Sequence, residues 1–170
     1  MSVAAFSKLN AILIKAASGV TAVCLAVIAV VIPYEVFGRY VLGDMPVWSG
    51  EAATFSMVWA AMMGSAVGLK KGYQVSLNLF VDMLPKIPRL AVTACMYAGM
   101  LVFLGLMAWF GLHQTLVNMH QRSTAIGMPM SLPYLALPAG FTLMLLITVE
   151  QCWNFFRTES KEGRGCLPRS

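Results

Sequence analysis

Charged side chains are scarce in this sequence. Asp, Glu, Lys and Arg make up 11% of the 170 residues, whereas a soluble domain contains about a quarter. Hydrophobic residues make up 59%. This imbalance excludes an ordinary soluble domain, and the apolar segments leave no room for a separate one. The sequence therefore predicts a single integral membrane domain over residues 1–170.

Residues suited to catalysis or metal binding are also few. The two histidines, His113 and His120, fall in one segment, and a haem held between helices would need a histidine on another. The four cysteines form no CxxC or CxxH motif, which argues against zinc and redox sites. GxSxG, HExxH and P-loop motifs are missing as well. We expect no enzyme, and no cofactor or metal in this chain.

Apolar stretches, in contrast, are long enough to cross a bilayer as helices. Four predicted spans cover about residues 12–38, 49–71, 89–118 and 131–157. The first could be a signal peptide, but its apolar run is long for one, and Pro33-Tyr34-Glu35 replaces the small-residue cleavage site. We therefore predict an all-α membrane protein with four transmembrane helices.

Two segments outside the spans have patterns of their own. Within residues 75–84, VSLNLFVDML, apolar residues recur at i, i+3, i+4 and i+7, which predicts a short amphipathic helix on the membrane surface, ended by Pro85. A strand-like loop is the alternative, because residues 75–79 also alternate. The polar tail, residues 158–170, is expected to be mobile.

The basic residues predict the orientation of the chain. Ten of the twelve Lys and Arg residues fall in the N-terminal segment, the loop after the second span and the C-terminal tail. Cytoplasmic segments carry this excess, so both termini are predicted to be cytoplasmic. The net charge of +5 could suggest nucleic acid, but the basic residues flank apolar segments and form no patch. The expected surroundings are a lipid bilayer, with no nucleic acid as partner.

The second span has a small residue at every fourth position. These residues are Ala52, Ser56, Ala60, Gly64, Gly68 and Gly72. Small residues let membrane helices approach closely, and Gly64 and Gly68 form a GxxxG motif. The alternative is composition alone, since bilayer helices are rich in Gly and Ala. We predict that the ridge Ala60–Gly64–Gly68 packs against a helix of this chain or of a partner.

Ionisable residues at membrane depth are functional candidates by default, and Glu150 is the deepest acid. Lys15 lies at a comparable depth in the first span, so a structural Lys15–Glu150 ion pair is predicted in preference to ion coupling. Near the other membrane surface, Glu35 and Arg39 are spaced to pair on one helix face. Tyr34, Tyr40 and Trp48 of the same segment are predicted to form an aromatic belt there.

The succession of features resembles the small integral-membrane subunit, the Q or DctQ-type subunit, of tripartite ATP-independent periplasmic (TRAP) transporters. Four segments carry the resemblance in order: EVFGRYVLGDMPVWSGE, AATFSMVWAAMMGSAVGLKKG, VSLNLFVDMLP and TAIGMPMSLPYLALPAG. It covers about residues 20–156. Two departures are visible, since the family often has two acids where Gly50-Glu51 stands, and often a histidine where Tyr73-Gln74 stands.

This resemblance implies a function for a chain without an obvious site. Such a subunit pairs with a large multi-span membrane subunit that carries substrate and sodium, while a periplasmic binding protein delivers an organic acid such as a dicarboxylate or sialic acid. Uptake across the bacterial or archaeal cytoplasmic membrane is sodium-driven, and the small subunit braces the large one. Four residues would then fix the periplasmic corner: Glu35, Arg39, Trp48 and Glu51.

The competing class is a stand-alone, homo-oligomeric small membrane transporter or channel. Such a protein would need a polar stripe along its spans. The available polar residues are Thr21, Thr54, Ser56, Ser65, Thr93, Thr142, Thr148 and Glu150. They are scattered, and most can bond to carbonyls of their own helix. An enzyme is a more remote third class.

Overall fold

A computed structural model describes the backbone of residues 3–43, 47–81 and 86–165, and the side chains of residues 7–41, 43, 47–71, 91–155 and 157. The chain forms α1 (Val3–Phe37), which ends in a π-helical turn η1 (Gly38–Leu42), then α2 (Val47–Val81), α3 (Lys86–Val117), a short 3-10 turn η2 (Asn118–His120) and α4 (Ser131–Gly165). Within these ranges all four long helices are apolar and long enough to cross a membrane, which confirms the predicted all-α membrane fold.

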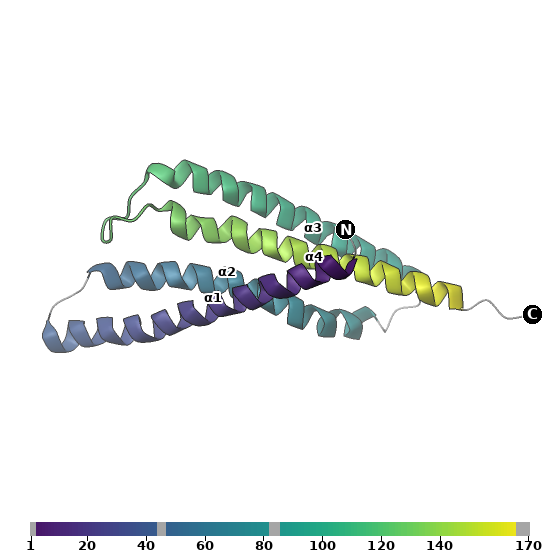
Figure 1. Ribbon diagram of the computed structural model, residues 1–170, viewed down its shortest axis with the longest axis horizontal. Coiled ribbons are helices and arrows are strands. Elements are labelled where there is room, and N and C mark those ends of the chain that lie inside the picture. Colours follow the sequence, from purple (N-terminus) through teal and green to yellow (C-terminus); the bar gives the residue numbers. More distant parts are fainter. Residues whose placement is uncertain (1–2, 44–46, 82–85, 166–170) are drawn as a thin grey trace, which may run out of the picture.

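The four helices form two antiparallel hairpins that lie side by side (Figure 1). α1 packs on α2, α3 packs on α4, and the hairpins meet where α2 packs on α4. α1 and α3 run one way along the assembly and α2 and α4 run the other way, so the two chain ends point to the same end. α2 and α4 are therefore the central pair, and α1 also touches α4.

Alanine makes up half of the described apolar residues that are buried in the interior. Ala60 and Ala66 of α2, Ala17 of α1 and Ala136 of α4 are buried, together with four larger residues, Met63, Tyr97, Leu104 and Ile147. Most large apolar side chains, in contrast, face outward. This distribution suits a bilayer, where burial of apolar surface between helices gains little and close packing of small residues brings the helices together.

The predicted spans agree with the apolar helical segments Ser7–Val41, Val47–Lys71, Ala91–His120 and Ser131–Phe155. Residues 75–81 are helical, as predicted, and do not form a strand-like loop. They continue α2 without a break through Val81, however, so they do not form a separate helix. Only Gly72 weakens that stretch, and one glycine costs a helix about 1 kcal/mol, too little to end it. Residues 82–84, and the side chains of the predicted amphipathic face, lie outside the described residues.

The first part of the tail predicted over residues 158–170 is helical, because α4 continues as far as Gly165, and its mobility stays a prediction. Residues 157–165 contain no proline and include Arg, Glu and Lys, which are good helix formers. A polar composition therefore does not interrupt the helix. Residues 166–170 lie outside the described residues.

Candidate functional site: two polar clamps between the helical hairpins

Among the described side chains, charged residues connect the two hairpins at two places, both on α2. Glu51 lies near the start of α2 and Lys70 lies further along it. With a rise of about 1.5 Å per residue, the two are separated by about 28 Å along the helix axis. The hydrocarbon layer of a bilayer is about 30 Å thick. The two contacts thus have the spacing of the two membrane surfaces, with the apolar α2–α4 contact between them.

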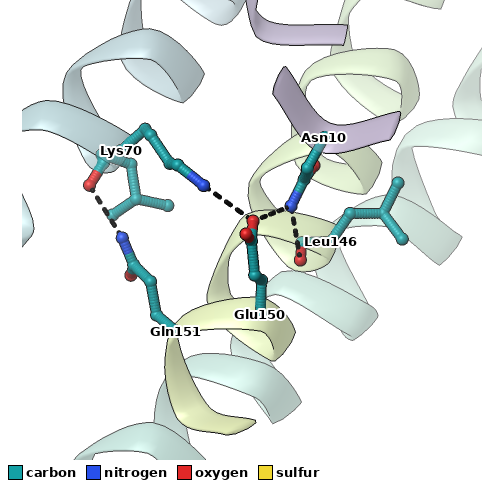
Figure 2. A network of polar contacts seen from close by, with 6 residues as sticks. Asn10, Lys70, Leu146, Glu150 and Gln151 are labelled. Atoms are coloured by element: carbon teal, nitrogen blue, oxygen red, sulfur yellow. Dashed lines mark hydrogen bonds and ion pairs between the residues drawn. The ribbon is translucent and has the colours of Figure 1, made fainter. Parts of the chain in front are cut away.

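The first contact, which we name the terminal clamp, consists of Asn10, Lys70 and Glu150 (Figure 2). Asn10 lies near the start of α1, and Glu150 lies in the C-terminal half of α4. Lys70 Nζ lies 2.7 Å from Glu150 Oε2. Asn10 Nδ2 donates hydrogen bonds to the same carboxylate oxygen and to the carbonyl of Leu146, the latter at 3.4 Å. Glu150 is only 6% exposed. One buried carboxylate on α4 thereby joins α1 and α2.

The residue after Glu150 strengthens the same junction. Gln151 Nε2 donates a hydrogen bond of 3.4 Å to the carbonyl of Leu69, the residue before Lys70 on α2. Figure 2 shows Gln151 next to the Lys70–Glu150 ion pair. Two consecutive residues of α4 therefore contact two consecutive residues of α2, which fixes the register of the two helices.

The structure corrects the predicted partner of Glu150, which is Lys70 instead of Lys15. Lys15 is exposed. The residue of α1 that faces α4 is Asn10, and a step of five residues turns about 140° around a helix. Lys15 therefore points away from the carboxylate, although it lies at a similar depth.

The second contact, which we name the loop clamp, joins Glu51 to residues 123–126 of the loop between α3 and α4. Glu51 Oε1 accepts hydrogen bonds from the Thr124 hydroxyl at 3.5 Å and the Ala125 N–H at 3.2 Å. Oε2 accepts from the Ser123 hydroxyl and from the Ile126 N–H, the latter at 3.2 Å. A carboxylate on the first hairpin thus holds the loop of the second.

Hydrogen bonds within the loop give it a defined shape. Met130 N–H donates to the Gln121 carbonyl at 2.9 Å, and Ser123 N–H donates to the Met128 carbonyl at 2.9 Å. Inside these, Gly127 N–H donates to the Ser123 carbonyl at 3.1 Å. Gly127 has a φ of 72°, a left-handed conformation that glycine adopts without steric cost.

Other residues predicted for this corner behave differently. The rings of Tyr34 and Trp48 lie 6.1 Å apart, as expected of the aromatic belt, whereas Tyr40 is 80% exposed. Among the residues with described side chains, Glu35 and Arg39 form no ion pair. The α-helix gives way to the π-helical turn at Gly38, so the regular four-residue spacing does not hold between them. Their role at an interface stays a prediction.

The predicted small-residue ridge has two different surroundings. Ala60 is buried. A Cβ at Gly64 would lie 3.5 Å from Thr21 Cγ2 of α1, so this part of the ridge packs within the subunit. A Cβ at Gly68 would meet nothing within 4 Å, and Gly68 is exposed. The ridge rotates by about 40° with each four-residue step, which explains why it leaves α1.

Two closer approaches were missed at the sequence level. A Cβ at Gly140 of α4 would lie 2.8 Å from Met62 Cβ of α2. A Cβ at Gly111 of α3 would lie 3.2 Å from the backbone nitrogen of Pro138 on α4. Glycine in an apolar helix was the available signal, but neither position belongs to the four-residue repeat of the second span. These glycines allow α4 to approach both of its neighbours.

The described polar residues thus define a class of protein: an integral membrane protein of two helical hairpins, whose buried polar groups join its helices. Among the described residues, no group of three or more His, Cys, Asp or Glu could hold a metal ion. The contacts of the two clamps also contain no group of residues suited to acid–base or nucleophilic catalysis.

Sequence comparison then gives the family. The family described as tripartite ATP-independent periplasmic transporters, DctQ component, matches residues 12–158, and the chain belongs to it. The sialic acid TRAP transporter small permease protein SiaQ of Vibrio cholerae is 24% identical over 138 residues, which are 81% of this chain and 80% of that protein. The resemblance seen in the sequence is confirmed.

Two C4-dicarboxylate TRAP transporter small permease proteins, both named DctQ, are also similar. The protein from Rhodobacter capsulatus is 34% identical over 116 residues, 66% of this chain and 50% of that protein. The protein from Vibrio cholerae is 23% identical over 146 residues, 71% of this chain and 62% of that protein. The match therefore spans about half the length of the Rhodobacter relative.

These relatives are transporter permease subunits, which confirms that the chain belongs with transporters and not with enzymes. Together with the four apolar helices, they indicate a multi-pass protein of the inner membrane. Membership of the family implies partnership with a large membrane subunit and a periplasmic binding protein.

Proposed function

We propose that this chain is the accessory subunit that braces the large membrane subunit of a sodium-driven TRAP transporter importing an organic acid. The observation that carries the proposal is that the buried polar groups of this chain bond its own helices and loop together. Asn10 and Lys70 both bond to Glu150, and Glu51 bonds to the α3–α4 loop. Both sets hold helices together, as a brace requires, while the outer surface remains apolar.

Sodium and substrate are proposed to bind elsewhere. Sodium belongs to the large subunit, and the small subunit binds no cofactor of its own. Glu150, the deepest acid, already has a cation in Lys70, which leaves little reason for sodium to bind there. A periplasmic binding protein would deliver the organic acid. The relatives named for sialic acid and for C4-dicarboxylates illustrate the range of substrates associated with such small subunits.

The proposed orientation places both termini and the terminal clamp at the cytoplasmic surface, in a bacterial or archaeal cell. The loop clamp then lies at the periplasmic surface. The excess of Lys and Arg in the N-terminal segment, the α2–α3 connection and the C-terminal segment supports this orientation.

Polar residues of the spans offer little support for a stand-alone channel or transporter. Four of the hydroxyls that could line a path donate instead to the carbonyl four residues earlier in their own helix. They belong to Thr21, Thr54, Ser65 and Thr148. Such bonds satisfy the hydroxyls locally and do not build a shared polar stripe.

Replacing Glu150 by glutamine tests whether this acid is structural. In the transporter reconstituted in vesicles, we expect Glu150→Gln to leave the sodium dependence of uptake unchanged, because glutamine can still accept hydrogen bonds from Asn10 and Lys70. The measurement is initial uptake against sodium concentration. A lost sodium response in a normally assembled complex would show that Glu150 takes part in coupling.

A substitution at Gly68 tests whether the large subunit contacts this part of α2. Gly68 is exposed on α2 with nothing within 4 Å of an added Cβ, so leucine can be accommodated within the subunit itself. If this part of the ridge packs on the large subunit, Gly68→Leu will reduce the yield of the purified complex while the subunit still inserts. Gly99→Leu, at an equally open position on α3, is the matched control. Equal yields for both variants would remove Gly68 from the interface.

A further inference from the structure

We propose that residues 123–126 form a carboxylate-binding site, and that Glu51 is the ligand that occupies it. The loop would then be an anion-binding site in which the Glu51 carboxylate is bound. When the Glu51 side chain is removed, a separate carboxylate can bind there instead.

The arrangement of donors matches a carboxylate oxygen by oxygen. Oε1 receives one hydroxyl and one backbone N–H, from Thr124 and Ala125. Oε2 also receives one hydroxyl and one backbone N–H, from Ser123 and Ile126. Successive backbone N–H groups that converge in a turn form an anion-binding concavity. Hydrogen bonds to an ionised acceptor are stronger than those between neutral groups.

The loop holds these donors in place through its own bonds. Ser123 is 4% exposed, and its backbone bonds to Gly127 and Met128 on the other side of the loop. The Ile126 N–H also lies 3.3 Å from the Ser123 hydroxyl oxygen, which can accept from it. None of these bonds involves Glu51. The donors therefore remain directed toward one point when the carboxylate is removed.

The chemical class of the ligand follows from this geometry. Two pairs of donors, each pair directed at one oxygen, suit a planar group with two oxygens and one negative charge. Alanine at position 51 retains Cβ and leaves out one methylene and the carboxylate, and acetate supplies a methyl group and a carboxylate. Acetate is therefore the probe that restores the missing atoms.

The experiment compares backbone amide exchange of the full-length chain and of Glu51→Ala in mild detergent. We expect the amides of Ala125 and Ile126 to exchange about tenfold faster or more in Glu51→Ala, because each loses a charge-assisted bond. Sodium acetate should slow this exchange in a saturable way, whereas sodium chloride at equal ionic strength should not. The unsubstituted chain should not respond to acetate, since its tethered carboxylate has a high effective concentration.

Two further variants make the result specific. Ser123→Ala combined with Glu51→Ala should lose the acetate response, because one oxygen then lacks its hydroxyl donor. Glu35→Ala, which removes an acid near the same end but outside the clamp, should exchange like the unsubstituted chain at Ala125 and Ile126. If Glu51→Ala does not fold, Glu51→Asp, shorter by one methylene, should show faster exchange at these two amides.

The proposal is overturned if acetate and chloride have the same effect on folded Glu51→Ala. It is also overturned if the amides of Ala125 and Ile126 keep their original exchange rates in Glu51→Asp. The first result would mean that the loop loses its shape without Glu51, and the second that the carboxylate is not what protects the amides.

Discussion

Replacing Lys70 by methionine is expected to lower the free energy of unfolding by about 2 kcal/mol. Breaking a buried ion pair by removing one partner costs about 3–5 kcal/mol. The cost here is smaller because the Lys70 side chain is 33% exposed, although Glu150 is nearly covered. Methionine keeps most of the apolar stem, so the loss reflects the charge. Denaturant titration of the purified subunit in detergent micelles measures it.

Lys71→Met is the matched control, because Lys71 is the adjacent cation on α2 and is exposed. It should change stability by less than about 0.5 kcal/mol, as surface substitutions usually do. The double variant Lys70→Met with Glu150→Leu should be more stable than Lys70→Met alone, since no unpaired carboxylate remains buried. If Lys70→Met is as stable as Lys71→Met, the terminal clamp does not hold the helices together.

Replacing Gly140 by alanine is the second substitution with a large expected effect. The added Cβ would lie 2.8 Å from Met62 Cβ, and this atom is fixed to the α2 backbone. α2 and α4 must therefore move apart, and overpacking of this kind costs about 1–3 kcal/mol. The expected result is a lower unfolding midpoint in the same denaturant titration, with looser contact between the hairpins.

Gly68→Ala provides a control of the opposite sign. An added Cβ there meets nothing within 4 Å. Alanine is favoured over glycine in a helix interior by about 0.5–1 kcal/mol, so this variant should be as stable as the original chain or slightly more stable. Equal effects of Gly140→Ala and Gly68→Ala would contradict the close approach of α2 and α4.

Hydropathy was sufficient to predict the fold. The four spans and the all-helical class follow from long apolar runs, because a bilayer requires backbone groups to bond within each segment. The ends of the helices were harder to predict. α2 and α4 continue beyond the apolar runs to Val81 and Gly165, because nothing in those polar stretches stops a helix. Polarity was therefore a poor guide to where a helix ends.

The polar contacts show which information the sequence lacks. Depth in the membrane indicated Lys15 as the partner of Glu150, but depth does not show which side of α1 faces α4, and the partner is Lys70. Asn10 was the overlooked signal, as a polar residue close to an apolar run. The donors around Glu51 depend on the loop conformation, which hydrophobic patterns do not describe. Gly140 likewise required the packing partner of α4 to be known.

The most direct test of the proposed function is purification of this chain from native membranes in mild detergent, with the bound proteins identified by mass spectrometry. The account predicts a large multi-span membrane protein at equal stoichiometry, as expected for a small permease subunit of a TRAP transporter. Recovery of the chain only as a homo-oligomer, in a preparation that keeps other membrane complexes intact, would contradict it.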